Sequence, residues 1–416
     1  MRKMKDSGIE WIGEIPEGWE LIKAKYLFSQ RNEKGNSTLV LLSPTQKYGV
    51  IPQSQLEGVV QVKETTDLRA FKTIHIGDFV ISLRSFQGGF EFSNYEGVCS
   101  PAYQVFHATK DLSNDFFRYL FKSDGFISKI NSLTVGIREG KNIQYWDFSN
   151  MLLAVPPKEI QIRSAQYLNA KCTEIDTMLS KTRSSIEEYK KLKQAVITQA
   201  VTKGVRGERE MKDSGVEWVS EIPANWTVKR GKQLFSETNE RSETGSEELL
   251  TVSHITGVTP RSQKTVNMFM SESLVGYKIC HNGDLAANTM WMWQGAIGVS
   301  KFHGVISPSY NTYRQKANDY YFEYLDYLLR IRPLIDTYTI HSTGMTLSRL
   351  RLYPDSFLSL YFIVPPITEQ KEIADFLDTK CTEIDKLIAK KEQLVKELES
   401  YKKSLIYEVV TGKREV

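Results

Sequence analysis

Two long stretches of the chain place apolar residues at alternating steps of three and four. Residues 165–200 contain nine apolar side chains at eleven such positions, and residues 374–409 contain the same number. This spacing aligns apolar side chains along one seam of an α-helix, as in a coiled coil. Neither stretch contains proline or glycine before Gly204 and Gly412, which fit C-terminal caps. We predict two long helices, with seam residues Leu168, Ile175, Leu179, Ile186, Tyr189, Val196, Leu377, Ile384, Ile388, Val395, Leu398 and Leu405.

The segments before each helix have a different residue pattern. Short runs rich in Val, Ile, Phe and Tyr, such as 39–42 and 79–82, alternate with Gly, Ser, Asn and Pro and are typical of strands. Residues 115–120 and 320–329 favour short helices. We therefore predict an α+β protein in which two globular domains alternate with two long helices. The boundaries we assign are 1–157 (domain 1), 158–206 (central helix), 207–366 (domain 2) and 367–416 (distal helix).

The chain is a tandem duplication. Residues 4–11 read MKDSGIEW and residues 211–218 read MKDSGVEW, and further matching blocks follow in the same order at offsets of 207 to 209. The last of them is KCTEID, at 171–176 and again at 380–385. A period this long is not that of a solenoid, so each repeat is one domain plus one helix.

Each long helix needs a partner, because a helix with one apolar seam is not stable alone in water. At 1.5 Å per residue, about 40 residues make a helix of roughly 60 Å. A parallel pair would require a globular domain to bridge that length, so we predict an antiparallel coiled coil with internal pseudo-two-fold symmetry. The alternative is that both helices pack against other subunits.

Composition narrows the class of protein only slightly. The chain has 416 residues and a net charge of +4, with an excess of five positive charges in residues 158–206, which leaves nucleic-acid binding open. It shows no signal-like N-terminus, no run of the roughly 20 apolar residues needed to span a membrane, and four cysteines without a CxxC pair. We expect a cytoplasmic protein with no metal site and no membrane association.

The sequence lacks the common catalytic motifs. There is no phosphate-binding loop, no dinucleotide fingerprint and no HExxH set. Asp355 followed by Glu369 and Lys371 imitates a Mg²⁺-dependent nuclease pattern, but the first repeat has Trp146 and Ile160 at the two acidic positions. We therefore expect no catalytic residues and no enzymatic activity from this chain.

The layout resembles the specificity subunits of type I restriction–modification systems. The resemblance rests on the openings MKDSGxEWxxEIPxxW, on Gly-Asp before a strand, and on VPPITEQKEIA at 364–374 with Ile384-Asp385 in the following helix. It covers the whole chain. One departure is that the first helix opens Lys-Glu-Ile-Gln at 158–161 instead of with Glu-Gln.

The resemblance implies a function in DNA recognition. In such subunits each globular domain reads one half of a bipartite double-stranded DNA target. The paired helices set the half-site spacing and dock two modification subunits, which methylate adenine. No cofactor is expected in this chain; S-adenosylmethionine, ATP and Mg would belong to the modification and restriction/translocase partner subunits.

Positions where the repeats diverge between matching blocks are candidates for DNA contact. Arg suits guanine and Asn or Gln suits adenine in the major groove, while other basic side chains suit phosphates. The candidates in domain 1 are Gln53, Gln55, Arg69, Arg84, Ser85, Gln87, Thr134, Arg138 and Lys141. Those in domain 2 are Arg261, Gln263, Lys264, Asn288, Thr289, Trp291, Gln294, Thr343, Thr346, Arg349 and Arg351.

Two alternatives stay open at this point. The chain could serve a fused methylase–nuclease instead of a three-subunit system, or it could be a coiled-coil scaffold without a role on DNA. The sequence specifies neither the target bases nor their spacing.

Overall fold

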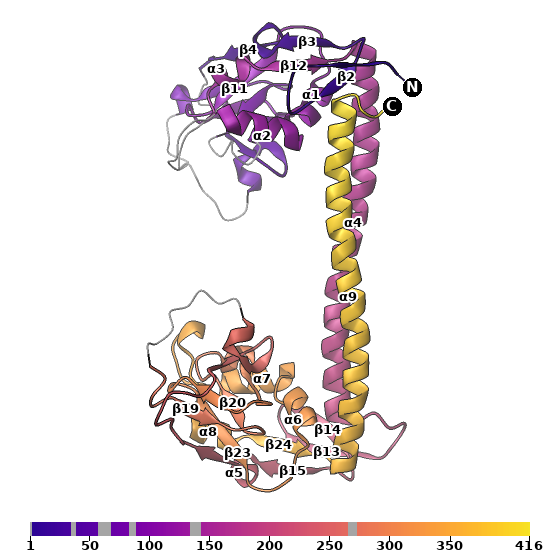
Figure 1. The fold of residues 1–416 in the computed structure, drawn as a ribbon. Coiled ribbons are helices and arrows are strands. Elements are labelled where there is room, and N and C mark those ends of the chain that lie inside the picture. Colours follow the sequence, from indigo (N-terminus) through magenta and orange to yellow (C-terminus); the bar gives the residue numbers. More distant parts are fainter. Residues whose placement is uncertain (1, 35–38, 57–67, 83–88, 134–142, 265–272) are drawn as a thin grey trace. The chain divides into compact units, whose positions relative to one another are not determined.

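The structure, a computed structural model, describes residues 2–34, 39–56, 68–82, 89–133, 143–264 and 273–416 (Figure 1). Its contacts divide the chain into two units. Unit 1 contains Met1–Arg183 and Gln393–Val416, and unit 2 contains Ser184–Glu392. Each unit therefore holds one globular domain and one part of each long helix. None of the described helices is both long and apolar enough to cross a membrane.

The domain of unit 1 is built on a four-stranded antiparallel sheet in the order β4-β11-β8-β9, with the two-stranded ladders β1-β2, β3-β12, β5-β6 and β7-β10 around it. The sheet strands are β4 (Phe28–Arg31), β11 (Gln104–Ala108), β8 (Phe79–Ile81) and β9 (Phe90–Phe92). The other strands are β1 (Met4–Asp6), β2 (Glu14–Pro16), β3 (Glu20–Lys23), β5 (Leu42–Thr45), β6 (Gly49–Pro52), β7 (Lys72–Ile74), β10 (Gly97–Cys99) and β12 (Leu152–Val155). The helices are α1 (Asn114–Phe121), α2 (Asp124–Leu133) and α3 (Tyr145–Ser149).

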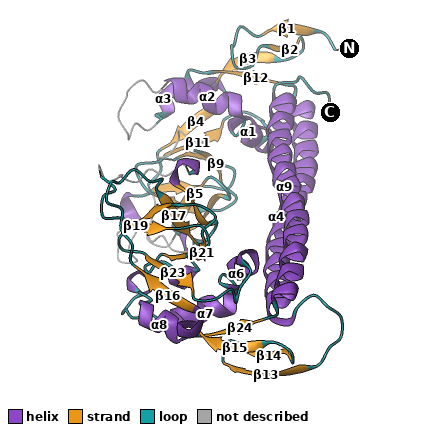
Figure 2. Ribbon diagram, turned by 60° about the horizontal axis from the view of Figure 1, so that its bottom comes forward, coloured by secondary structure: helices purple, strands orange, loops and turns teal. Residues whose placement is uncertain are grey.

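Unit 2 repeats this topology, with the sheet order β16-β23-β20-β21. Figure 2 draws the strands in orange and the helices in purple. Its sheet strands are β16 (Phe235–Thr238), β23 (Asn311–Gln315), β20 (Leu285–Ala287) and β21 (Ile297–Val299). The ladders pair β13 (Met211–Val216) with β14 (Val219–Pro223), β15 (Thr227–Arg230) with β24 (Tyr361–Val364), β17 (Leu250–Ser253) with β18 (Gly257–Pro260), and β19 (Lys278–Cys280) with β22 (Gly304–Ile306). The helices are α5 (Gly231–Leu234), α6 (Phe322–Leu328), α7 (Arg332–Ile340) and α8 (Pro354–Ser359).

The two domains fill the same framework with different side chains. In unit 1 the centre of the core is Phe28, whose ring centroid lies 5.2 Å from that of Phe117 and 5.6 Å from that of Phe106. In unit 2 several of the buried core residues are tyrosines, and Tyr313 packs on Phe357 with ring centroids 4.6 Å apart. The duplication thus preserves the strand order while the core residues have changed.

The long helices are α4 (Lys158–Lys203) and α9 (Ile367–Val410). In unit 1, Lys402 of α9 pairs with Asp176 of α4 at 2.6 Å, and Glu399 pairs with Arg183. Partner numbers fall on one helix as they rise on the other, so the helices run antiparallel. In unit 2, Lys193 pairs with Asp385 at 2.6 Å. The predicted α+β class with antiparallel helix pairing is confirmed.

These contacts explain why a heptad seam carries lysine. Lys193 and Lys402 occupy equivalent seam positions, and each binds the aspartate of the repeated Ile-Asp motif on the other helix. The predicted seam residues are buried or half-buried throughout: Leu168, Ile175, Leu179, Ile186, Tyr189, Val196, Leu377, Ile384, Ile388, Val395, Leu398 and Leu405.

Each domain is fastened to its helix by a buried glutamine in the first helical turn. Gln161 accepts a hydrogen bond from the Ser113 backbone N–H and donates to the Pro156 carbonyl, both at 2.9 Å. Gln370 accepts from the Tyr321 N–H and donates to the Pro365 carbonyl, both at 2.8 Å. The departure noted in the first helix is therefore limited to Ile160, which stands where the second helix has Glu369.

Candidate nucleic-acid interface

Two divergent stretches of domain 2 lie near one shared turn, and a third region contacts the second of them. We call them together the loop face: Arg261–Gln263, with Lys264; residues 288–294; and residues 343–351. The shared turn contains Ser309 and Tyr310 of the repeated Ser-Pro-x-Tyr block. The sequence predicted 261–263, 288–294 and 342–346 as divergent stretches and Lys264, Arg349 and Arg351 as phosphate contacts.

Tyr310 lies near residues of the first two stretches. Burial raises the pKa of Tyr310, while the nearby Arg261 guanidinium and a hydrogen bond from Asn288 act in the opposite direction. Arg261 itself is held by its backbone N–H, which donates to the Leu249 carbonyl at 2.9 Å. Lys264 donates to the Ser253 hydroxyl at 3.2 Å, and its pKa is lowered by burial.

The third stretch joins the second through backbone contacts. The Leu352 N–H donates to the Thr289 carbonyl at 3.4 Å, and Thr343 and Arg351 exchange two backbone hydrogen bonds of 2.9 Å. Between them, a Cβ atom at position 344 would lie 2.6 Å from the Arg349 carbonyl oxygen, so the backbone at Gly344 requires glycine. Thr343, Thr346 and Arg349 are exposed there, and Arg351 is half-buried.

The structure buries Asn288, for which the sequence predicted a base contact. Its side-chain oxygen accepts the Met290 N–H at 3.2 Å. That oxygen is thus engaged inside the domain, and the base contact of Asn288 stays a prediction. Thr289 is half-buried and its hydroxyl donates to the Ser309 carbonyl at 3.1 Å. Gln294 is half-buried, whereas Trp291 and Gln263 are exposed.

In domain 1 the described part of the corresponding region is smaller. Gln53 and Gln55 lie in the 3-10 turn after β6, where the Gln53 N–H donates to the Leu41 carbonyl at 2.9 Å, as Arg261 does in domain 2. Gln55 and Arg69 are exposed. Six candidates lie outside the described residues: Arg84, Ser85, Gln87, Thr134, Arg138 and Lys141.

The shared Gly-Asp motif has a structural role that the sequence did not reveal. Asp284 is buried and accepts two hydrogen bonds from Arg314, at 2.8 and 2.9 Å. Asp78 accepts two from Arg31, at 2.8 and 3.2 Å. The arginine comes from β23 in one domain and from β4 in the other, so the ion pair has been retained although its partner strand has changed.

The geometry gives no support to the nuclease pattern. Glu369 is fully buried, forms an ion pair with Arg209 and accepts a hydrogen bond from the Trp226 indole at 3.1 Å. It is thus not available to bind a metal ion. Among the described residues, no group of three His, Cys, Asp or Glu side chains could hold a metal ion.

No protein-family model matches the chain. Solved structures do match it along nearly its whole length. A chain from a type I R-M system, in a structure concerned with complex assembly and conformational transition, has a TM-score of 0.74 and 14% identity and covers 96% of this chain and 99% of that one. The HsdS subunit from Thermoanaerobacter tengcongensis has a TM-score of 0.56 and 15% identity and covers 96% and 98%. The chain has the fold of a type I specificity subunit. The resemblance carried by the sequence motifs is confirmed at the level of the fold.

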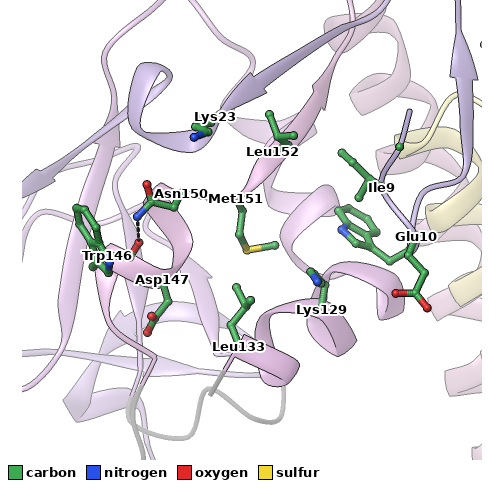
Figure 3. Close-up of a pocket in the computed structure, with 12 residues that line it drawn as sticks. Ile9, Glu10, Lys23, Lys129, Leu133, Trp146, Asp147, Asn150, Met151 and Leu152 are labelled. Atoms are coloured by element: carbon green, nitrogen blue, oxygen red, sulfur yellow. Dashed lines mark hydrogen bonds between the residues drawn. The ribbon is translucent and has the colours of Figure 1, made fainter. Parts of the chain in front are cut away.

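Within this specificity-subunit fold, a cavity of about 620 Å³ opens in domain 1 (Figure 3). Trp11, Trp146 and Leu152 line it, and the Asn150 amide donates to the Trp146 carbonyl at 3.0 Å. At the equivalent of Leu152, domain 2 has Tyr361, whose carbonyl accepts from Trp218 at 3.0 Å. The lining carries no histidine, cysteine or serine among the described residues. Its charged lining residues are Glu10, Lys23, Lys129 and Asp147.

A second cavity of the specificity-subunit fold, about 490 Å³ in unit 1, contains a buried carboxyl group. Glu91 accepts a hydrogen bond from the Lys122 ammonium at 2.6 Å, while its Oε2 has no hydrogen-bond partner among the described residues. Burial raises the pKa of Glu91 above its ordinary 4.5, and Lys122 opposes this in part. A raised pKa in the folded state means that the contribution to stability is fully present below about pH 4.5 and is lost as the pH rises through the folded pKa.

We expect Glu91→Gln to raise the unfolding temperature of unit 1 at pH 8, with the difference from the unsubstituted chain closing toward pH 4. Thermal unfolding followed by circular dichroism across this range measures it. Glu33→Gln is the matched control, and its change in unfolding temperature should have the opposite sign. The reason is that a hydrogen bond from His75 lowers the pKa of Glu33. An equal loss of stability at every pH in Glu91→Gln would contradict the prediction.

Proposed function

We propose that this chain is the DNA sequence-recognition subunit of a type I restriction–modification complex. Each globular domain reads one half of a bipartite duplex target. The helix pair sets the distance between the half-sites and docks two modification subunits. The chain itself is non-catalytic, and its partners carry S-adenosylmethionine and, for restriction, ATP and Mg.

The observation that carries this proposal is the duplication of a recognition-type domain on one antiparallel helix pair. In domain 2 the loop face gathers Arg261, Lys264, Arg349 and Arg351, which suit phosphate and guanine contacts. A reader of two separated half-sites needs two such domains held at a fixed distance. We include in this proposal that individual side chains of the loop face contact bases directly.

A second duplicated feature supports the docking of two identical partners. Met178 and Leu387, at equivalent positions of α4 and α9, are 54% and 41% exposed. Leu192 and Tyr401, also equivalent, are 49% and 47% exposed. Unit 1 therefore presents Met178 and Tyr401, and unit 2 presents Leu387 and Leu192. Exposed apolar side chains repeated on helix faces are typical of protein interfaces.

Charge accompanies the apolar side chains on this face. Lys171 lies two helical turns before Met178 and forms an ion pair with Glu174 at 2.8 Å, and Lys380 repeats it with Glu383 at 2.9 Å. The pKa of Lys171 is raised first by Glu174 and to a smaller extent by Tyr167 and Tyr401, so Tyr401 lies near it. Each unit thus offers the same kind of surface to one modification subunit.

We expect Met178→Asp to weaken the binding of one modification subunit at least tenfold, because a charge replaces an apolar contact worth about 1.5–3 kcal/mol. Native mass spectrometry should show two partners per chain for the unsubstituted protein and one for this variant. The double variant M178D/L387D should bind none.

Thr177→Asp is the matched control, since Thr177 is exposed one residue away and about 100° around the helix. It should keep both partners. Two partners retained by M178D/L387D, with unchanged circular dichroism, would exclude this docking surface.

The experiment that tests the proposed function is co-expression with the modification subunits, followed by long-read mapping of methylated adenines. We expect one bipartite sequence to be methylated, and no methylation from this chain alone. The mass of the co-purified partner distinguishes a separate modification subunit from a fused methylase–nuclease. Methylation by the isolated chain, or duplex binding by the complex without sequence preference, would reject the proposal, and the second result would favour the scaffold.

A further inference from the structure

The turn that follows β20 presents an exposed tryptophan on a fixed backbone. Trp291 is 45% exposed. Its N–H donates to the Asn288 carbonyl at 2.9 Å, and its carbonyl accepts the Ala296 N–H at 3.1 Å. The 3-10 turn Met292–Gln294 follows and ends at Gly295, whose φ of +85° favours glycine.

The ring of Trp291 packs against a second indole ring. It stacks on Trp293 with centroids 5.9 Å apart and an interplanar angle of 17°. The Trp293 indole N–H donates to the Met290 carbonyl at 3.1 Å, which fixes the second ring. Met292 is buried beneath the turn, and helix α7 packs against it through Ile335 at Gly295. Trp291 therefore occupies a preorganised position.

The polar groups of the same turn are mostly used within the domain. Asn288 is buried, and the Thr289 hydroxyl donates to the Ser309 carbonyl. On the adjoining stretch of the loop face, Met345 is 98% and Leu347 is 60% exposed. Among the described residues, the loop face therefore exposes apolar side chains at positions 291, 345 and 347.

We infer that Trp291 is a specificity-determining residue that contacts the 5-methyl group of a thymine in the half-site of domain 2. This inference rests on the proposed function and names the base feature that this part of the loop face recognises. In the major groove, the thymine methyl group is the apolar feature of the base edges, whereas the remaining positions are donors and acceptors. Covering those polar atoms with an indole ring would leave them without hydrogen bonds, at a cost that a methyl group does not incur.

The test replaces thymine by uracil, which lacks only this methyl group, at one position after another in both half-sites. Binding of the complex with its modification subunits is measured for each duplex. We expect one position to lose about three- to fivefold in affinity, as the loss of one apolar methyl contact predicts. The Trp291→Ala complex should bind the thymine duplex at least as weakly as the unsubstituted complex binds the uracil duplex. Replacing thymine by uracil should cause this variant no further loss of affinity, because the effects of two groups in contact are not additive.

Two further variants make the test decisive. Trp291→Phe keeps an apolar ring and should retain a preference for thymine over uracil. Trp146→Ala removes an indole that is 72% exposed in domain 1 and should leave the uracil profile unchanged. Circular dichroism and partner stoichiometry verify that each variant folds and assembles.

Several results would overturn the inference: no uracil effect at any position, an unchanged uracil effect in Trp291→Ala, or 2-aminopurine fluorescence showing that Trp291 stacks on an unpaired base. These outcomes presuppose sequence-specific binding by the unsubstituted complex. Absence of that binding would instead reject the proposed function.

Discussion

Lengthening both long helices by one heptad should move the half-sites apart. We expect insertions after Arg183 in α4 and after Glu392 in α9 to reduce methylation of the original target at least a hundredfold. Both points lie at the boundary between the two units, so every contact within each unit is kept. Seven residues add about 10 Å to a helix, which corresponds to about three base pairs at 3.4 Å each. A displaced domain faces base pairs outside its half-site, and each mismatched base pair costs about 1–3 kcal/mol of binding free energy.

Mapping of methylated adenines measures the result. Sites that are still methylated should keep both half-sites and have a spacer longer by up to about three base pairs. In the control, the same heptads replace residues 184–190 and 386–392 instead of extending the helices, and the original spacing should persist. An unchanged spacing in the lengthened variant would show that the helix pair does not set this distance.

The second large effect concerns a buried ion pair found only in the second repeat among the described residues. We expect Glu369→Gln to lower the free energy of unfolding of unit 2 by about 3 kcal/mol, because it leaves Arg209 with an uncompensated charge in a largely buried site. The substitution also weakens the contact with the Trp226 indole. Denaturant unfolding followed by far-ultraviolet circular dichroism measures the change.

A neighbouring ion pair provides the matched control. Glu372 binds Arg206 at 2.8 Å on the surface, where both side chains are about half exposed. Glu372→Gln should cost less than 1 kcal/mol, because solvent screens exposed pairs. The double variant R209M/E369I, which adopts the first repeat's residue at 369, should recover much of the loss. Equal losses in Glu369→Gln and Glu372→Gln would contradict the assignment of a buried charge.

The sequence predicted the fold well where periodicity and repetition carry the signal. A heptad pattern sustained over about forty residues has few alternatives to a long helix, and a second copy on the same chain supplies a partner. Even Lys193 and Lys402, which interrupt the seams, occupy matching positions in the sequence. Their partners, Asp385 and Asp176, became known only from the paired helices.

The loop residues were predictable as regions but not one by one. Divergence between the repeats marked both Asn288 and Trp291, and the fold buries the first and exposes the second. In the sequence, Asn288 is one polar residue of a variable loop, whereas in the structure its side-chain oxygen accepts the Met290 N–H inside the domain. Likewise Asp284 is a motif residue whose partner, Arg314, lies thirty positions away on another strand.

The sequence by itself determined the duplication and the two long helices, because these depend on local periodicity and on a repeat that is visible along the chain. It also predicted the antiparallel pairing, from the length that a globular domain would otherwise have to bridge. Only the tertiary structure decided which divergent side chains face solvent, which carboxylates are ion-paired, and that residues near 261 and 288 of domain 2 lie close to Tyr310. Those properties depend on contacts between residues distant in sequence, and burial and hydrogen bonding are set by such contacts and not by the identity of a residue alone.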